Sequence, residues 1–432
     1  MTQVNPVCTH VSASSLASLK ACPMRYRLAY REGLRVARDT ESQRIGLSWH
    51  KMHETYRDFH LAYLDQMAEP LSEAAQKDAS DGALTKVIEY LDERYSNLPD
   101  WVTPETAELE RTILLTSFQG YLWYYQNDTI TTLATELKFD LPLLNRIGLP
   151  LPTAEVIKVG MIDRIIFWQN MVGNTEYKST SRTIHGEGGR EYWDMYKKND
   201  QISMYAVALR ALAKSGLLPA TIAALLAEKP ELRFGNTLLD VWKRPTIKPA
   251  GLSQKDYTVF IESHEYYGQT FEITVTDERQ IDTGEVDAKG KAKTQQTATV
   301  IIDGANATVE PGSKGFSIRE TTQMYAARLL HEITELPEKY FIRREIVRTA
   351  AELKAAEIGF FNAYQVGKFM EAEGTWFENG SACKATFKCA FMPICFGPGA
   401  DSVCDSVTTP VGFKRIFVDL TKEGESLEGE EA

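Results

Sequence analysis

A mixed α/β fold is the class that the sequence predicts, on three observations. Helical signals fill the first third of the chain, β-rich runs fill the middle, and helical periodicity returns over residues 320–374. The 432 residues are enough for a large core or for two to three domains. A hydrophobic content of 43% and a charged content of 25% are ordinary for a soluble globular protein.

Helix signals dominate the N-terminal third. The cluster Ser12-Ala13-Ser14-Ser15 is typical of a helix N-cap, and apolar residues follow at helical spacing as far as residue 35. Residues 44–130 are predicted to be helical. Within them, Thr103 is an expected N-cap with Pro104 at the first helical position. The helix that follows carries an apolar stripe expected to face the core: Leu109, Ile113, Leu114, Phe118, Tyr121, Leu122 and Tyr125.

Strand signals begin at Leu133. Residues 136–141 alternate like a strand, and residues 154–167 form a long β-rich run. Gly173-Asn174 is interpreted as a turn before a further strand at Thr175–Lys178. Residues 200–212 return to a helical pattern.

Residues 252–318 are predicted to be mainly β with flexible loops. A polar stretch over residues 282–296 is interpreted as an insertion or an elaborated β-hairpin. The predicted strands of this region are 258–261, 271–275 and 298–302.

The net charge of −11 argues only weakly against a nucleic-acid partner. Acidic residues concentrate in a tail from Glu423 onward, while basic residues bunch at four places, so a local groove can still be positive. The N-terminus has no signal-peptide pattern, and no run of 18 apolar residues predicts a membrane span. A cytoplasmic location is expected, where the six cysteines stay reduced. The four basic groups are Lys197-Lys198, Lys243-Arg244, Lys291 to Lys293, and Arg343-Arg344.

A metal site is predicted from Asp163 and the triplet Glu176-Tyr177-Lys178. Residues two apart in a strand share a face, so Glu176 and Lys178 are expected to point together. A hairpin would place Asp163 opposite Glu176, and a hard cation would relieve the repulsion of the two carboxylates. Such a cation, Mg²⁺ or Mn²⁺, suits phosphodiester hydrolysis, with Lys178 stabilising charge on the phosphate.

Each part of this pattern has a simpler explanation. A lone acidic-x-Lys triplet is usually an exposed ion pair, and a lone histidine such as His50 is usually a core or surface residue. His50 on an upstream helix would supply an imidazole ligand. Gln201 and Tyr205 lie four apart, on one helix face, and would hold Lys178 or a phosphate, although ordinary helix packing explains them equally.

The cysteines leave two interpretations open. Cys383, Cys389 and Cys395 cluster near the end of the chain, and Cys22 precedes Pro23 near the start. Four thiolates from both ends of the chain would suit an iron–sulfur cluster. The alternative is that they are free thiols in a loop-rich segment. A zinc site is disfavoured, because its usual close C-x₂₋₄-C pairs are absent.

Taken together, these motifs resemble the PD-(D/E)xK nuclease superfamily, in particular the RecB-type, AddB-like exonucleases that carry an iron–sulfur cluster, among them stand-alone phage and bacterial nucleases. Their order along one chain is what makes the resemblance specific. The segments that carry it are Ser12 to Leu34, Gly46-x-x-x-His50, Val159 to Ile165, Glu176 to Thr180, Gln201-x-x-x-Tyr205 and Asn379 to Cys395.

This resemblance implies roles for these residues. His50, Asp163, Glu176 and the Tyr177 carbonyl would bind Mg²⁺ or Mn²⁺, and Lys178 would be catalytic. Asp163 and Glu176 would also be catalytic residues, and Gln201 and Tyr205 would support the active site and the DNA. The ligands implied for a [4Fe–4S] cluster are Cys22, Cys383, Cys389 and Cys395.

The fold that the resemblance implies is a restriction-endonuclease-like mixed central β-sheet flanked by helices, with a C-terminal iron–sulfur staple. The predicted segments are 1–35 with the first cluster cysteine, 36–130 helical, 131–249 nuclease core, 250–319 β-rich insertion, 320–412 helices and cysteine cluster, and 413–432 tail.

The expected function is a metal-dependent DNA exonuclease in recombination, repair or phage replication, acting on single strands or duplex ends. A recombinase or helicase is a further expected partner. No association with a membrane is expected. The alternatives are an endonuclease of the same fold and a non-catalytic DNA-binding protein. ATP hydrolysis is not expected, because the nearest stretch to a P-loop, Gly284 to Thr294, has the wrong glycine spacing.

Overall fold

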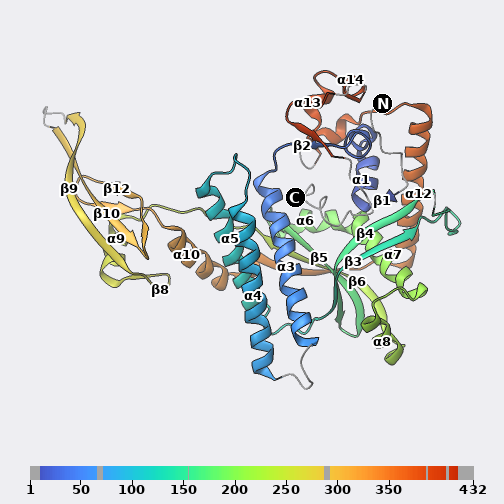
Figure 1. The fold of residues 1–432 in the computed structure, drawn as a ribbon, viewed down its shortest axis with the longest axis horizontal. Helices are drawn as coiled ribbons and strands as arrows, with labels where there is room; N and C mark the ends of the chain where they lie inside the picture. Colours follow the sequence, from blue (N-terminus) through green and yellow to red (C-terminus); the bar gives the residue numbers. More distant parts are fainter. Residues whose placement is uncertain are drawn as a thin grey trace.

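A mixed β-sheet with helices on both faces forms the body of the protein, and a β-rich arm projects from it (Figure 1). The computed structural model describes residues 10–65, 72–153, 155–286, 292–385, 388–404 and 408–416. The prediction of a mixed α/β fold is confirmed. The acidic tail predicted from Glu423 onward and the basic residue Lys291 lie outside the described residues.

The central sheet has six strands in the order β1-β4-β5-β6-β14, with β3 paired to β4. The β1–β4 and β5–β6 pairs are parallel, and the β3–β4, β4–β5 and β6–β14 pairs are antiparallel. The strands are β1 (His10–Val11), β3 (Thr131–Pro142), β4 (Ile157–Trp168), β5 (Met171–Thr180), β6 (Arg233–Lys243) and β14 (Phe341–Ile346).

A fork in the sheet separates β4 from β5. The two strands pair from Trp168 opposite Met171 to Arg164 opposite Thr175. The next positions are Asp163 on β4 and Glu176 on β5, where the strands diverge. The start of β4 pairs instead with β1. Divergent strands leave space for side chains between them, so the fork is where a site can form.

Two hydrophobic cores fix the helices to the sheet. On one face, α1, α7 and α12 pack against β3, β4 and β5 through residues such as Leu16, Leu209 and Phe360. On the other face, α3, α4, α5 and α10 pack around Trp49 and Trp242. The helices of the body are α1 (Ala13–Ala21), α3 (Glu41–Asp65), α4 (Glu73–Ser96), α5 (Pro104–Tyr124), α6 (Arg190–Asp194), α7 (Asp200–Ser215), α8 (Ala220–Glu228), α10 (Thr322–Glu335), α11 (Pro337–Tyr340) and α12 (Ala350–Glu373).

Helix starts follow the predicted capping chemistry. Ser12 and Ser15 form a reciprocal capping box at α1, and the Thr103 hydroxyl accepts a hydrogen bond from the Thr106 amide at α5. No single helix in the described ranges is long and apolar enough to cross a membrane; α7 and α8 pass that test only as a pair bent by 74°.

The turn predicted at Gly173-Asn174 is wrong. The chain turns at Gln169 and Asn170, both with positive φ, and residues 173 and 174 lie inside β5. Gly173 is required there for another reason. A Cβ atom on it would lie 2.8 Å from the backbone oxygen of Asn236 on β6. Glycine therefore marks a close approach of two strands, which a sequence pattern does not distinguish from a turn.

Replacing Gly173 with alanine should destabilise the sheet, because a backbone carbonyl has little room to move away. We expect a loss of about 1–3 kcal/mol in the free energy of unfolding, measured from urea denaturation midpoints. Gly188→Ala is the control, since its Cβ would meet only a methyl group of Thr183 at 3.6 Å. Equal midpoints for the two variants would contradict the proposed clash.

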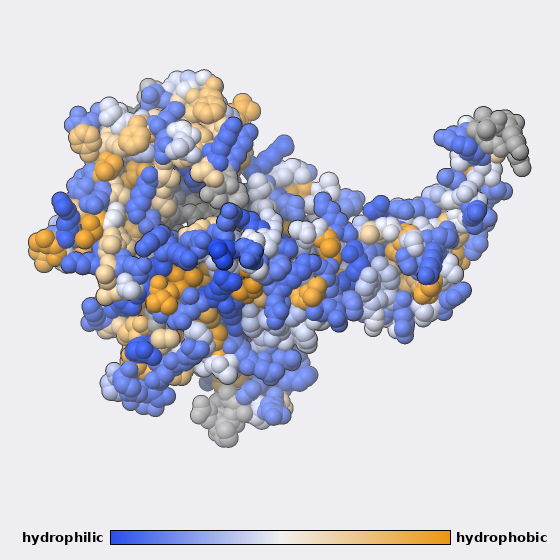
Figure 2. Space-filling view, turned by 180° about the vertical axis from the view of Figure 1, so that it is seen from behind, coloured by the Kyte–Doolittle hydropathy of each residue, from blue (hydrophilic) through white to orange (hydrophobic). Residues whose placement is uncertain are grey.

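The arm has a hydrophobic core of its own, centred on Phe260, Phe271 and Ile302. Its two long strands pair as an antiparallel hairpin that reaches away from the body (Figures 1 and 2). The strand predicted at 258–261 is wrong, since these residues lie in α9 with Phe260 facing the core. The elements are α9 (Gln254–Ser263), β7 (Glu265–Tyr266), β8 (Gln269–Thr270), β9 (Ile273–Val286), β10 (Ala292–Ile302), β11 (Ala305–Asn306), β12 (Val309–Pro311) and β13 (Phe316–Ile318).

Residues 320–374 are not wholly helical, because β14 interrupts them and completes the sheet beside β6. The C-terminal segment packs on the N-terminal one, and β15 pairs with β2. The described segments nearest the two ends of the chain are therefore packed against each other. The elements here are α2 (Pro23–Tyr26), β2 (Leu34–Val36), η4 (Gly380–Lys384), α13 (Met392–Cys395), α14 (Ala400–Cys404) and β15 (Phe413–Arg415).

Candidate active site

The two predicted acidic residues lie at the fork between β4 and β5, away from solvent. Asp163 is 4% exposed and Glu176 is fully buried. The Asp163 Oδ2 atom accepts a hydrogen bond of 3.0 Å from the Tyr177 amide, which joins the diverging strands. Buried like charges repel in a medium of low dielectric constant, so this arrangement favours a bound cation.

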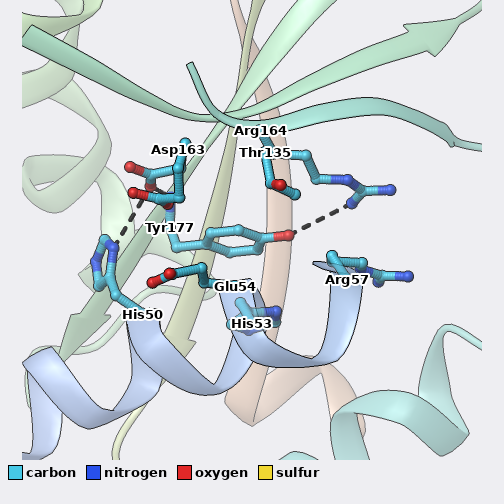
Figure 3. Close-up of a pocket in the computed structure, with 9 residues that line it drawn as sticks. His50, His53, Glu54, Arg57, Thr135, Asp163, Arg164 and Tyr177 are labelled. Carbon is cyan, nitrogen blue, oxygen red and sulfur yellow. Dashed lines mark hydrogen bonds and ion pairs between the residues drawn. The ribbon is translucent and has the colours of Figure 1, made fainter. Parts of the chain in front are cut away.

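His50 reaches the same place from α3. Its Nδ1 atom is 3.5 Å from Asp163 Oδ2, as Figure 3 shows. Burial lowers the pKa of His50 to about 3, and the charge of Lys178 contributes to this shift. The imidazole is therefore neutral at physiological pH, which is the form that binds metal ions.

Lys178 lies beside the acidic pair on the same strand face as Glu176. Its Nζ atom is 2.9 Å from Glu176 Oε1 and donates a hydrogen bond of 3.0 Å to Gln201 Oε1. Gln201 in turn donates from Nε2 to the Tyr205 hydroxyl at 3.2 Å. The predicted pair on α7 thus holds the predicted lysine.

Tyr205 is set against a glycine of β4. A Cβ on Gly160 would lie 3.3 Å from the Tyr205 ring and 2.6 Å from the Phe139 ring. Gly160 therefore lets α7 approach the sheet closely enough for Gln201 to reach Lys178. The structure brings together His50, Asp163, Glu176, Lys178, Gln201 and Tyr205.

Tyr177 has its side chain on the opposite face of β5, as strand alternation predicts. Its ring is stacked on His53 with 3.9 Å between ring centroids, and its hydroxyl accepts a 3.5 Å hydrogen bond from Arg164. The role of its carbonyl as a metal ligand stays a prediction.

Sequence reasoning missed several residues that line the pocket beside Asp163. His53, Glu54 and Arg57 follow His50 along α3, so helical spacing alone could have indicated them. Glu136 is on β3 opposite Asp163 and has a left-handed backbone with φ +47°. Such strain in a residue other than glycine is frequent at functional sites, but no sequence signal reveals it.

The donor set at the fork suits a hard divalent cation. Two carboxylates and a neutral imidazole converge from three elements, and oxygen-rich sets favour Mg²⁺ or Mn²⁺. Lys178 lies against Glu176 as a counter-charge. Among the described residues, no group of three or more His, Cys, Asp or Glu side chains is already arranged to hold a metal ion. Binding would therefore require Asp163, Glu176 and His50 to close around the ion.

Comparison with protein-family models gives a match over residues 10–395, to the model described as the PD-(D/E)XK nuclease superfamily. The chain belongs to the PD-(D/E)XK nuclease superfamily. The matched range includes every residue of the fork and extends to Cys395. The mixed sheet flanked by helices is the restriction-endonuclease-like core of this superfamily. A search of curated proteins found no match.

Members of the PD-(D/E)XK superfamily are generally nucleases that use divalent metals such as Mg²⁺ or Mn²⁺ and act on DNA. Membership therefore indicates metal-dependent nuclease chemistry for this chain. Membership does not distinguish exonucleases from endonucleases.

The four predicted cluster cysteines lie in the region where the N-terminal and C-terminal segments pack together. The Asn379 amide donates to Cys22 Sγ at 3.4 Å, and the Cys389 amide donates to the Cys383 carbonyl at 2.9 Å. The pKa of Cys395 is raised to about 12 by burial, by Glu378, and then by Cys389 and Cys22. Cys22, Cys389 and Cys395 pack against one small hydrophobic core.

Cys404 differs from these four. It is buried in the same small core, but Glu32 and Arg27 act on its thiol, whose pKa burial raises to about 12. Its thiol therefore has charged neighbours that are not among the four cysteines.

Proposed function

We propose that this protein is a metal-dependent DNA exonuclease of the RecB type, acting in recombination, repair or phage replication. The observation that carries the proposal is the convergence of His50, Asp163 and Glu176 at the fork, with Lys178 2.9 Å from Glu176. Superfamily membership supports nuclease chemistry, and the resemblance to RecB-type enzymes supports action at DNA ends.

His50, Asp163, Glu176 and the Tyr177 carbonyl would hold Mg²⁺ or Mn²⁺. When bound, such an ion polarises a phosphate and lowers the pKa of a coordinated water. The chain supplies the geometry for this: the Tyr177 amide fixes the Asp163 carboxylate, and α3 holds His50 in its neutral form.

Lys178 would face a phosphate that enters the fork, because its ammonium group lies beside Glu176. Its ammonium group would stabilise negative charge that develops on the phosphate during hydrolysis. Gln201 holds this ammonium by its amide oxygen, and Tyr205 holds Gln201. These hydrogen bonds from α7 therefore fix the position of the Lys178 ammonium group.

The test is degradation of end-labelled linear DNA in Mg²⁺ or Mn²⁺, with covalently closed circular DNA as the control. An exonuclease shortens the linear molecule and leaves the circle intact. Cutting of the circle would instead support an endonuclease of the same fold. The projecting arm favours that second candidate, since an added module could recognise a site.

We also propose that Cys22, Cys383, Cys389 and Cys395 bind a [4Fe–4S] cluster that joins the two chain ends. Protein purified without oxygen should be brown, with absorbance near the blue end of the visible spectrum. Cys22→Ser should lose the colour, whereas Cys404→Ser should keep it, because Cys404 lies among Glu32 and Arg27 instead. Zinc in place of iron and sulfide on elemental analysis would contradict the proposal.

A further inference from the structure

A second set of polar groups lies beside the fork, at the hydroxyl end of Tyr177. Arg57 and Arg164 lie there, His53 is stacked on the Tyr177 ring, and His50, Asp163 and Glu54 lie at the other end of the same pocket (Figure 3). The pocket is therefore basic at one end and acidic at the other. The Tyr177 residue spans them, with its amide on Asp163 and its hydroxyl on Arg164.

Neither arginine has a carboxylate partner among the described residues. Arg164 is 1% exposed and donates only to neutral oxygens: to Thr132 Oγ1 at 2.9 Å, and to the Tyr177 hydroxyl and the Ile130 carbonyl at longer range. The Nε atom of Arg57 is buried with no hydrogen-bond acceptor in the described part of the chain. A buried guanidinium normally has an acidic counter-charge.

The neighbouring Arg343 shows what is missing. Its guanidinium pairs with Asp240 at 2.7 Å and also with Asp128, so its charge is balanced within the protein. Arg57 and Arg164 line the same pocket. Two uncompensated cations side by side are unfavourable unless an anion joins them.

His53 adds a third donor. It is 1% exposed and packs against the Tyr177 ring, and neither of its ring nitrogens has a hydrogen-bond partner in the described residues. A neutral imidazole ring offers one N–H donor. Buried polar groups without partners call for an explanation, and a ligand with several oxygens would give Arg57 and His53 acceptors and give Arg164 a counter-charge.

We propose that Arg57, Arg164 and His53 form a binding site for a phosphate group of the nucleic-acid strand, next to the phosphate at the metal site. The identification of the ligand as a nucleic-acid phosphate rests on the proposed nuclease function, while the preference for an anion with several oxygens rests on the donors alone. One nucleoside separates consecutive phosphates of a strand, and one tyrosine separates the two ends of this pocket. The acidic end would take the metal ion, and the basic end would take the neighbouring phosphate.

The first experiment needs no nuclease activity. Thermal unfolding is measured in rising inorganic phosphate, with chloride at equal ionic strength as the reference. Wild type should be stabilised by phosphate in a saturable way. Arg57→Gln should bind phosphate at least about tenfold more weakly, as expected for loss of one charged hydrogen bond. Without phosphate, this variant should unfold at the same or a higher temperature, since a buried repulsion is removed.

Two further variants keep this test decisive. Arg146→Gln removes an exposed arginine in the turn between β3 and β4 and should bind phosphate as wild type does. Arg57→Lys keeps the charge, and should retain part of the binding if Arg57→Gln does not fold. No stabilisation of wild type by phosphate beyond chloride, or equal binding by wild type and Arg57→Gln, would overturn the site.

The second experiment identifies the phosphate. Cleavage rates are compared on DNA ending in a 5′-phosphate, a 3′-phosphate or hydroxyls only. A preference for one phosphorylated end that disappears in Arg57→Gln identifies a terminal phosphate. A rate lowered about tenfold or more on all three substrates identifies an internal one. Wild type that binds phosphate but cuts no DNA would refute the nuclease function and leave the anion site standing.

Discussion

Replacement of Lys178 with alanine is expected to lower the rate of DNA hydrolysis by about 10²–10⁴-fold with little effect on folding. The Lys178 side chain is 21% exposed and ends 2.9 Å from Glu176, so the truncation leaves no large cavity. The loss comes from the missing positive charge at the phosphate. It should therefore appear in kcat rather than in DNA binding, as fluorescence anisotropy in Ca²⁺ would show.

Lys197→Ala is the matched control. This lysine is 70% exposed at its side chain and pairs with Asp194 on the protein surface, so its removal should change the rate less than about twofold. Equal activity of wild type and Lys178→Ala would end the catalytic assignment of Lys178. A Gln201→Ala variant should give a smaller loss, because Lys178 would keep its charge but lose the hydrogen bond that positions it.

The arrangement of the candidate site could be predicted from the sequence because its members are fixed by local geometry. Strand alternation places Glu176 and Lys178 on one face, and helical spacing places Gln201 and Tyr205 on one face of α7. A two-strand hairpin is enough to bring Asp163 and Glu176 together, one position beyond the last pair, Arg164 opposite Thr175. The approach of His50 needed the family motif, because it depends on how α3 packs on the sheet.

The failures have a common physical origin in tertiary contacts. Gly173 indicated a turn because glycine tolerates one, yet it is needed for the approach of β6. Residues 258–261 are β-branched and aromatic, but burial of Phe260 in the core of the arm favours a helix. The β14 strand was not predicted, because it is short and lies between two helices in the sequence. The Arg57 and Arg164 pocket was missed because an unbalanced charge is visible only when all neighbours are placed.

Asp163→Asn should be more stable than wild type without metal and less stable than wild type with metal bound. Without metal, wild type holds two buried carboxylates at the fork, and neutralising one removes repulsion and desolvation. We expect the free energy of unfolding of this variant to exceed that of wild type by about 1–3 kcal/mol in EDTA. The asparagine oxygen can still accept the Tyr177 amide, so the strand contact is kept.

With Mn²⁺ or Mg²⁺ at about 100 times its dissociation constant, wild type should gain about 2.7 kcal/mol by linkage, whereas Asp163→Asn should gain almost nothing. Thermal unfolding in EDTA and in metal measures both changes, and DNA hydrolysis by the variant should fall with the lost binding. Asp140→Asn, an exposed change on β3, should follow wild type in every condition. If Asp163→Asn is less stable than wild type in EDTA and is equally stabilised by metal, Asp163 is a structural residue and the ion binds elsewhere.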